Sequence, residues 1–235
     1  MDHPSAPRRI VVTGASRGLG LGAVRLLLAS GASVIGTGKD ASRLGSAAAE
    51  LSKLGDFHAV AADLARPVEA AAILADAVAK RWGALDALVN NAAISGTGVF
   101  ESGPPADLDG VLEVNLLSPH RLIRALLPFL LKGREPRVLN VSSEAGQFKA
   151  LQSGRGDPSY FLSKYSLNGL TLLWAHELRG RVAVNSMHPG WIRSDMGGPQ
   201  ATDDLATGGA RILQALDKPF GATGKFWHGE EEMEW

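Results

Sequence analysis

The sequence predicts an α/β fold in which a doubly wound, parallel sheet of about seven strands carries helices on both faces. Short runs rich in Val, Ile and Ala alternate with longer helical patterns along most of the 235 residues. A glycine-rich turn, with Gly14, Gly18 and Gly20 in the spacing G-x-x-x-G-x-G, joins the first run to the first helical pattern. Because such alternation builds a parallel sheet between two helical layers, we expect a three-layer Rossmann fold.

The first half of the chain is expected to alternate regularly. Residues 10–12 are mostly β-branched, as buried strands often are. The helix after the glycine turn ends at Ser30–Gly31, where glycine suits a left-handed C-cap, and Asp40 is placed to cap the next helix. The remaining expected elements here are strands over 33–36, 57–61 and 87–90 and helices over 41–54 and 68–82.

The second half repeats the alternation with longer helices. A helical pattern over 105–131 is expected to bend near Pro119. A loop rich in Gly and Ser runs to Pro158, and residues 230–232 are expected to form a solvated acidic tail. The remaining expected elements are strands over 137–141, 182–187 and 225–227 and helices over 159–179 and 202–216.

Composition and charge narrow the classes of protein. Lys and Arg total 24 and Asp and Glu total 24, so no basic field favours nucleic acid or an anionic membrane. The chain has no cysteine, which excludes disulfides and cysteine nucleophiles. It shows neither a signal-peptide core nor an apolar run of membrane length. We expect a cytoplasmic protein with a flexible segment over 1–8 and a single domain over 9–235.

The glycine turn predicts an anion site. A strand that turns through glycines into a helix leaves unpaired N–H groups at the helix start, where the helix dipole also favours negative charge. Glycine allows a pyrophosphate to approach the backbone closely. The turn lacks the Gly-Lys pair of a triphosphate loop. The alternative interpretation is a glycine-rich turn that only closes a βα unit.

Tyr160 and Lys164 stand four residues apart on the expected helix 159–179, so their side chains share one face. An adjacent ammonium favours the phenolate, and we expect it to lower the pKa of Tyr160 from about 10. A tyrosine tuned in this way can donate a proton to a carbonyl oxygen or take it back. Such pairs also occur by chance on helix surfaces, so the pair alone is weak.

Together these motifs resemble the short-chain dehydrogenase/reductase family. The segments that carry the resemblance are Thr13–Gly20, Asn90-Asn91-Ala92-Ala93, Tyr160–Lys164 and His188–Gly198, with Ala93 in place of the family's glycine. The last of these segments and Gly224–Trp227 are similar to a carbonyl-reductase-like branch related to C-factor and sniffer proteins. The resemblance implies a catalytic set of Asn115, Ser143, Tyr160 and Lys164, with Ser142 as the alternative serine. Ser143 would hydrogen-bond the substrate carbonyl, and Asn115 would bend its helix and hold a water that leads to Lys164.

The resemblance also implies an NAD(P)-binding domain. The implied cofactor contacts are Gly14, Ser16, Arg17, Gly18, Leu19, Gly20, Lys39, Asp63, Leu64, Asn91, Ala92, Tyr160, Lys164, Pro189, Gly190, Ile192 and Ser194. Gly38 stands where NAD-preferring relatives carry an acid, and Lys39 and Arg17 resemble the cations of NADP(H)-preferring members. The alternatives are solvated side chains at Arg17 and Lys39, a ribose contact from Asp40, and a helix-capping role for Asp63.

The function implied is NADPH-dependent reduction of a ketone or aldehyde. The alternatives are an epimerase or dehydratase on the same scaffold and a non-enzymatic NADP(H)-binding signalling protein. His176 and His188 lack partners at metal-ligand spacing, so no metal is expected. The expected partner is a small carbonyl or alcohol substrate, and family analogy implies a homodimer or homotetramer. A mobile lid is expected between Ser194 and Leu205, and Phe148, Trp191 and Met196 would either line an apolar pocket or belong to the core.

Overall fold

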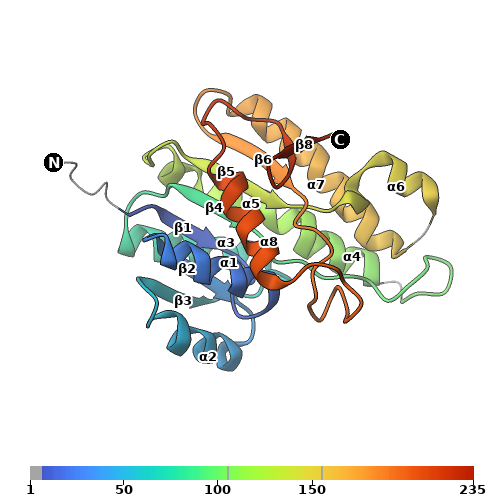
Figure 1. The fold of residues 1–235 in the computed structure, drawn as a ribbon, viewed down its shortest axis with the longest axis horizontal. Helices are drawn as coiled ribbons and strands as arrows, with labels where there is room; N and C mark the ends of the chain where they lie inside the picture. Colours follow the sequence, from blue (N-terminus) through green and yellow to red (C-terminus); the bar gives the residue numbers. More distant parts are fainter. Residues whose placement is uncertain (1–6, 105, 155) are drawn as a thin grey trace.

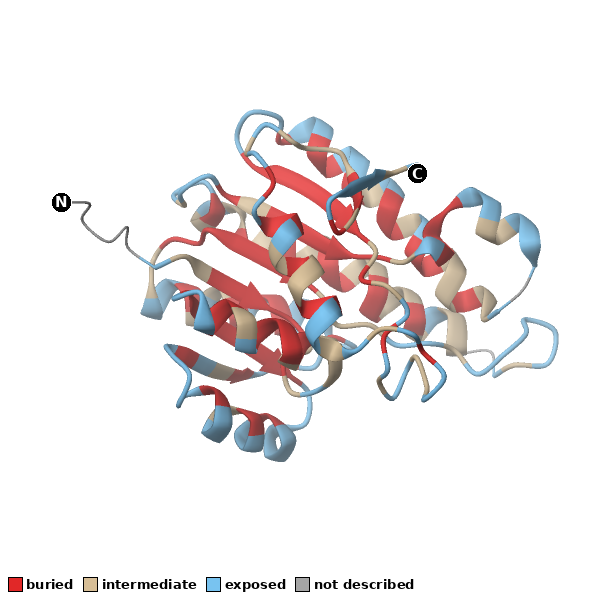
Figure 2. Ribbon diagram, in the orientation of Figure 1, coloured by how far each residue is buried: buried red, intermediate tan, exposed pale blue. Residues whose placement is uncertain are grey.

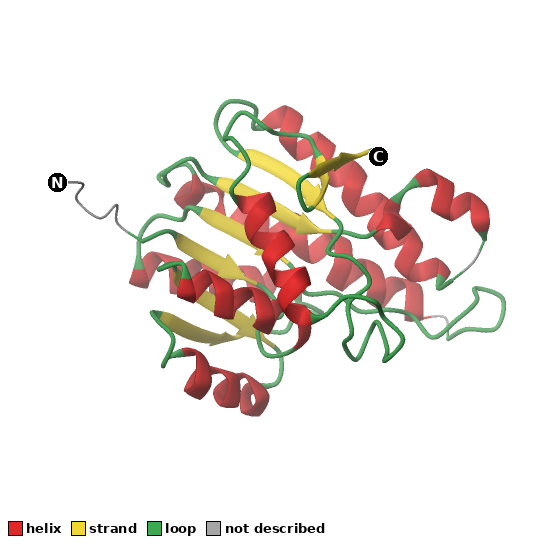
Figure 3. Ribbon diagram, in the orientation of Figure 1, coloured by secondary structure: helices red, strands yellow, loops and turns green. Residues whose placement is uncertain are grey.

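The computed structural model describes residues 7–104, 106–154 and 156–235 and has the strand–helix alternation expected from the sequence (Figures 1 and 3). The strands are β1 (Arg9–Val12), β2 (Ser33–Gly38), β3 (Phe57–Ala61), β4 (Ala87–Asn90), β5 (Arg137–Val141), β6 (Ala183–Met187), β7 (Phe226–His228) and β8 (Glu231–Met233). The helices are α1 (Gly18–Ala29), α2 (Ala41–Leu51), α3 (Pro67–Arg81), α4 (Ala106–Leu112), α5 (Ser118–Leu130), α6 (Phe148–Ser153), α7 (Pro158–Glu177) and α8 (Leu205–Leu216). A π-helical turn, η1 (Glu113–Leu117), and a 3-10 turn, η2 (Glu144–Gly146), complete the elements.

The strands form one sheet in the order β3-β2-β1-β4-β5-β6-β7-β8, and its first seven strands pair in parallel. The chain leaves β1 toward β2 on one side and later toward β4 on the other, so the strand order reverses at the β1–β4 pair. This is the doubly wound arrangement, and the predicted fold class is confirmed. In the described residues no helix is long and apolar enough to cross a membrane.

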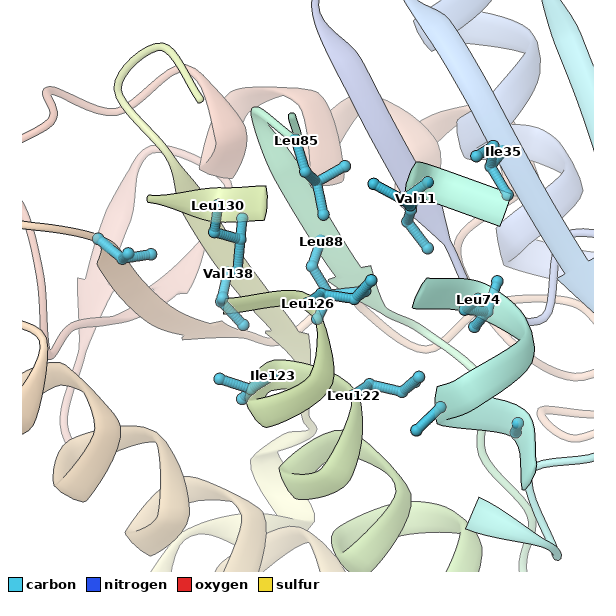
Figure 4. Close-up of a cluster of buried hydrophobic side chains, with 14 of the residues drawn as sticks. Val11, Ile35, Leu74, Leu85, Leu88, Leu122, Ile123, Leu126, Leu130 and Val138 are labelled. Atoms are coloured by element: carbon cyan, nitrogen blue, oxygen red, sulfur yellow. The ribbon is translucent and has the colours of Figure 1, made fainter. Parts of the chain in front are cut away.

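Strand side chains alternate between two apolar layers. Ile10 and Val12 lie in the cluster formed with α1, α2 and α8, whereas Val11 lies in the cluster formed with α3, α5 and α7. Figure 4 shows the second cluster, where Leu126 of α5 lies beside Leu88 of β4. Each fully buried Leu contributes about 1.5–3 kcal/mol, so these layers hold the helices on the sheet. Figure 2 shows the buried strands between partly exposed helices.

The region between β4 and β5 departs from the single bent helix predicted over 105–131. Residue 105 lies outside the described residues, and the rest forms α4, the π-helical turn η1 and α5. The irregularity lies at Asn115, one turn before Pro119, because the amide N–H of Ser118 bonds to the carbonyl of Glu113, five residues back. Pro119 lies in the first turn of α5, where proline is tolerated.

Three further elements were not predicted. The loop expected before Pro158 contains η2 and α6, and Gly154 ends α6 in the left-handed conformation at φ 61°. The expected acidic tail pairs as β8, antiparallel to β7, which makes eight strands instead of about seven. Its adjacent acids Glu231 and Glu232 stay exposed, and Glu232 forms an ion pair with Lys225. The flexible segment predicted over 1–8 falls largely on residues 1–6, outside the described residues; that prediction and the single-domain boundary remain predictions.

Candidate active site

A cavity of about 990 Å³ opens where the parallel strands end. Its walls come from the segments after β1, β2, β3, β4, β5 and β6 and from the start of α7. Figure 1 shows α4 and α6 at this end of the sheet. Open α/β sheets bind ligands at the carboxyl ends of their strands, where the strand order reverses. Every predicted site residue except Asn115 lines this cavity.

The glycine turn after β1 forms one end of the cavity. Gly14 and Gly18 have φ of 69° and 54°, and a Cβ at Gly20 would collide with the Gly14 carbonyl oxygen. No side chain caps the start of α1, and its first turn carries no acid, so its N–H groups face the cavity end without a competing carboxylate. The Thr13 hydroxyl accepts the N–H groups of Asn91 and Ala92, each at 3.0 Å, which holds the turn against the end of β4.

Basic side chains gather beside the glycine turn. Arg17, Lys39 and Arg43 line this end of the cavity. The carboxylate of Asp40 accepts the backbone N–H of Arg43 at 2.9 Å and caps α2, so the predicted N-cap is confirmed. Arg17 forms an ion pair with Asp195 from the segment after β6. This end of the cavity therefore combines free helix N–H groups with cations, as an anion site requires.

Asp63 and Leu64 line the cavity after β3. Asp63 accepts the N–H of Ala65 at 3.0 Å within its own turn. The residue that caps α3 is Arg66, so the alternative interpretation of Asp63 as a helix N-cap is wrong.

Tyr160 and Lys164 lie one turn apart on α7, with the ammonium nitrogen 5.5 Å from the centre of the phenol ring. Lys164 is buried, and its Nζ donates to the carbonyl oxygen of Val141 at 2.8 Å. Burial lowers the pKa of Lys164 to about 7 and raises the pKa of Tyr160 to about 12. The prediction of a lowered tyrosine pKa is therefore wrong, because burial disfavours the charged form of both groups.

The two candidate serines differ in orientation. The Ser142 hydroxyl is buried and lies 3.4 Å from the carbonyl oxygen of Lys164, on the inner side of α7. Ser143 hydrogen-bonds the Tyr160 phenol, which works against the raised pKa, and its hydroxyl accepts the N–H of Ala145 at 3.1 Å. The geometry therefore favours Ser143 as the serine that shares a substrate oxygen with Tyr160.

Asn115 lies behind the cavity wall in the π-helical turn η1. Its amide exchanges two hydrogen bonds with the backbone of Ile94, at 2.9 and 2.8 Å, and donates to the Ser163 hydroxyl at 3.0 Å. The side chain thus joins the segment after β4 to α7. Its hydrogen bonds go to Ile94 and Ser163 and do not reach Lys164, so the predicted water relay stays a prediction.

The segment after β6 carries Pro189, Gly190, Ile192 and Ser194 along the cavity. Arg211 of α8 donates to the Pro189 carbonyl and to Asp203, both at 2.7 Å, and Ile192 pairs with Asp203. The lid expected between Ser194 and Leu205 is therefore held in place at Asp203, near its C-terminal end. Sequence patterns did not reveal Asp203 and Arg211, because their partners lie in other elements. Trp191 and Met196 line the cavity and are half exposed, whereas Phe148 lies outside the lining.

His188 lines the cavity and stacks on His228 with ring centres 4.9 Å apart. Burial, reinforced by the neighbouring His228 and Arg211, lowers its pKa to about 4. The described residues contain no group of three or more side chains able to hold a metal ion.

Comparison with known proteins identifies the family. A family model described as short chain dehydrogenase matches residues 8–205. The chain belongs to the short-chain dehydrogenase family. A 3-oxoacyl-(acyl-carrier-protein) reductase from Vibrio cholerae is 35% identical over 188 residues, which are 79% of this chain and 74% of the relative. The C-signal protein of Myxococcus xanthus is 37% identical over 141 residues, 57% of this chain and 84% of the relative.

Solved structures of the family have the same fold as this chain. An NADPH-bound carbonyl reductase from chicken fatty liver superposes with a TM-score of 0.89 at 28% identity, covering 98% of this chain and all of the other. A Shigella flexneri short-chain dehydrogenase complexed with NADP gives a TM-score of 0.84 at 26% identity, covering 95% and 97%. The resemblance to the family seen in the sequence is confirmed, and the chain is an oxidoreductase of this family.

Proposed function

We propose that this protein reduces a ketone or aldehyde to an alcohol with NADPH. The observation that carries the proposal is the convergence of Ser143, Tyr160 and Lys164 in the cavity that also contains the glycine turn. Relatives that act as 3-oxoacyl and carbonyl reductases support the reaction class. Neighbouring structures that hold NADPH and NADP support the cofactor.

The residues of the cavity fit the cofactor. Free N–H groups at the start of α1 suit a pyrophosphate. The space beside Gly18 is open, because a Cβ placed there would have the Ser194 Cβ, 3.9 Å away, as its nearest neighbour. Arg17 and Lys39 suit a 2′-phosphate, and no acid takes the place of Gly38 at the end of β2. A bound nicotinamide cofactor would supply the hydride.

Tyr160 supplies the proton in this reaction. With a pKa of about 12 the phenol is protonated at neutral pH, as a general acid must be. Ser143 donates a hydrogen bond to the carbonyl oxygen and stabilises the negative charge that develops there. Lys164, with a pKa near 7, can exchange a proton at neutral pH and return one to the phenolate. The protonated phenol is the form in which Tyr160 begins the reduction.

The test of this function is Tyr160→Phe with Tyr165→Phe as a matched control on the same helix. We expect Tyr160→Phe to keep NADPH binding and to lose roughly 10²–10⁴-fold in kcat, because the proton donor is gone. Turnover is followed by NADPH consumption with a panel of ketones and aldehydes. Turnover near that of the wild type in Tyr160→Phe would contradict the assignment.

The cofactor assignment has its own test. We expect a higher kcat/KM with NADPH than with NADH, and a roughly tenfold loss of that preference in Lys39→Ala, since a charged contact to the phosphate is removed. Lys53→Ala, an exposed lysine outside the cavity, serves as control. A clear preference of the wild type for NADH would exclude the 2′-phosphate site.

The similarity to C-signal favours one second candidate, an NADP(H)-binding signalling protein without turnover. NADPH binding with no consumption on any carbonyl would support this alternative. Turnover without net NADPH consumption would instead indicate an epimerase or dehydratase.

A further inference from the structure

Asp157, the residue before α7, uses both carboxylate oxygens to join two parts of the cavity. Oδ1 accepts the N–H of Ser159 at 3.0 Å and of Tyr160 at 3.3 Å, which caps the helix at the residue that carries the phenol. Oδ2 accepts the N–H of Gly96, in the segment after β4. One side chain thus connects the catalytic helix to a segment 61 residues away in the chain.

The same segment is tied to α7 at a second point. Asn115 holds the backbone of Ile94 and donates to Ser163, whose hydroxyl donates to the carbonyl oxygen of Tyr160 at 2.7 Å. Tyr160 therefore lies between two ties, at Asp157 and at Ser163. A substitution at Gly96 would strain the first tie, since a Cβ there would lie 3.0 Å from Asp157 Oδ1 and 3.3 Å from the Ser159 Cβ.

We propose that Asp157 is a positioning residue for Tyr160, which fixes the start of α7 on the Ile94–Gly96 segment and places a negative charge beside the phenol. The proposal rests on the proposed function, in which Tyr160 donates the proton. A carboxylate there opposes the phenolate and keeps the tyrosine in its acid form. The effect of this charge on the phenol is opposite to that of a Lys164 ammonium, which would stabilise the phenolate.

Several titratable side chains besides Asp157 lie in the part of the cavity near the phenol. Besides Asp157, the titratable side chains in this part of the cavity are Lys164 on α7, Glu144 and Lys149 between β5 and α7, and His188 after β6. The Ile94–Gly96 segment contributes none. Burial is the largest cause of the raised tyrosine pKa, and Asp157 is the charged neighbour that adds to it.

The first experiment needs neither cofactor nor substrate. The chain has two tyrosines, so ¹³Cζ-labelled tyrosine gives two signals in an alkaline NMR titration, and Tyr165→Phe assigns them. We expect Asp157→Asn to shift the titration of Tyr160 to lower pH and to leave that of Tyr165 unchanged. An unchanged Tyr160 titration in the folded variant would overturn the proposal, whether or not the proposed reaction is correct.

The second experiment measures turnover. Asp157→Ser keeps a helix-capping hydroxyl but loses the charge and the tie to Gly96, and Gly96→Ala disturbs the tie from the other end. We expect kcat to fall roughly tenfold or more in both, with the Kd for NADPH unchanged. Asp107→Asn is the control, because Asp107 holds Thr97 of the same loop without reaching α7. Wild-type kcat in both folded variants, or an equal loss in Asp107→Asn, would overturn the proposal.

Discussion

At the scale of single residues, Lys164 shows how function opposes stability. Its side chain is 2% exposed, and in the described part of the chain no carboxylate forms an ion pair with it. The Val141 carbonyl is its hydrogen-bond partner. Burial of a charged ammonium with one neutral acceptor is unfavourable, so the lysine is held in place by the folding of the surrounding elements.

This unfavourable burial predicts a pH-dependent stability. The pKa of Lys164 falls from 10.5 to about 7 on folding, so between these values the unfolded chain binds more protons and the free energy of unfolding rises with pH. We expect Lys164→Met to be more stable than the wild type below pH 7 and to lose that advantage toward pH 10. The slope of the difference is at most about 1.4 kcal/mol per pH unit.

Urea unfolding of both proteins at several pH values measures this difference. Lys132→Met, which removes an exposed lysine, controls for the loss of a surface charge. A difference between wild type and Lys164→Met that stays constant with pH would show that the lysine is not neutralised on folding.

At the scale of elements, the sequence predicted what short-range patterns encode. β-branched runs and glycine spacing predicted the strands and the glycine turn, and the i, i+4 spacing predicted that Tyr160 and Lys164 share one face of a helix. The resemblance implied a bend at Asn115, where the irregularity lies, but the π-helical turn itself was not predicted. The bonds of Asn115 reach Ile94, 21 residues away, and short-range patterns do not encode them. Strand β8 was missed because its acids resemble a solvated tail until β7 provides the partner edge.

A buried polar chain links three strands and α7. Asn90 donates to Asn140 at 2.8 Å, Asn140 donates to Thr171 at 2.9 Å, and the Thr171 hydroxyl lies 2.9 Å from that of Ser186. Removal of the central hydroxyl leaves buried neighbours unpaired. We expect Thr171→Val to lower the free energy of unfolding by about 1–3 kcal/mol and to leave kcat unchanged, as measured by denaturant unfolding and NADPH consumption.

The control for Thr171→Val is Thr202→Val, which changes an exposed threonine in the segment before α8. Equal stability of the wild type and Thr171→Val would mean that the polar chain is compensated by repacking.

At the scale of the whole molecule, the cavity joins two halves of the sheet that differ in chemistry. Segments after β1, β2 and β3 carry the glycine turn and the cations, and segments after β5 and β6 with α7 carry Ser143, Tyr160 and Ser194. The motifs predicted which residues meet there. They did not predict that the pKa of Tyr160 is raised. Its main cause is burial, which results from the packing of all these segments, and a further cause is the charge of Asp157, which no motif singles out.

The C-terminal residues contact the cavity wall at one lining residue, Gln147. Gln147 is 3% exposed and lines the cavity, and its amide donates to the carbonyl oxygen of Glu234 at 2.7 Å. Trp235 stacks on Phe226 of β7 with ring centres 5.6 Å apart. We expect Trp235→Ala to lower the free energy of unfolding by about 0.5–1.5 kcal/mol and to raise KM for the carbonyl substrate, with the Kd for NADPH unchanged.

A double-mutant cycle separates this effect from a general loosening of the chain. If Trp235 acts through the Gln147–Glu234 bond, then Gln147→Met raises KM by a similar factor and the double variant adds little to either change, because both remove the same link. Additive changes in KM would mean that the stacked tryptophan and the cavity wall are independent. The cycle therefore tests whether the residues after the last strand help to shape a substrate site whose walls follow the first six strands.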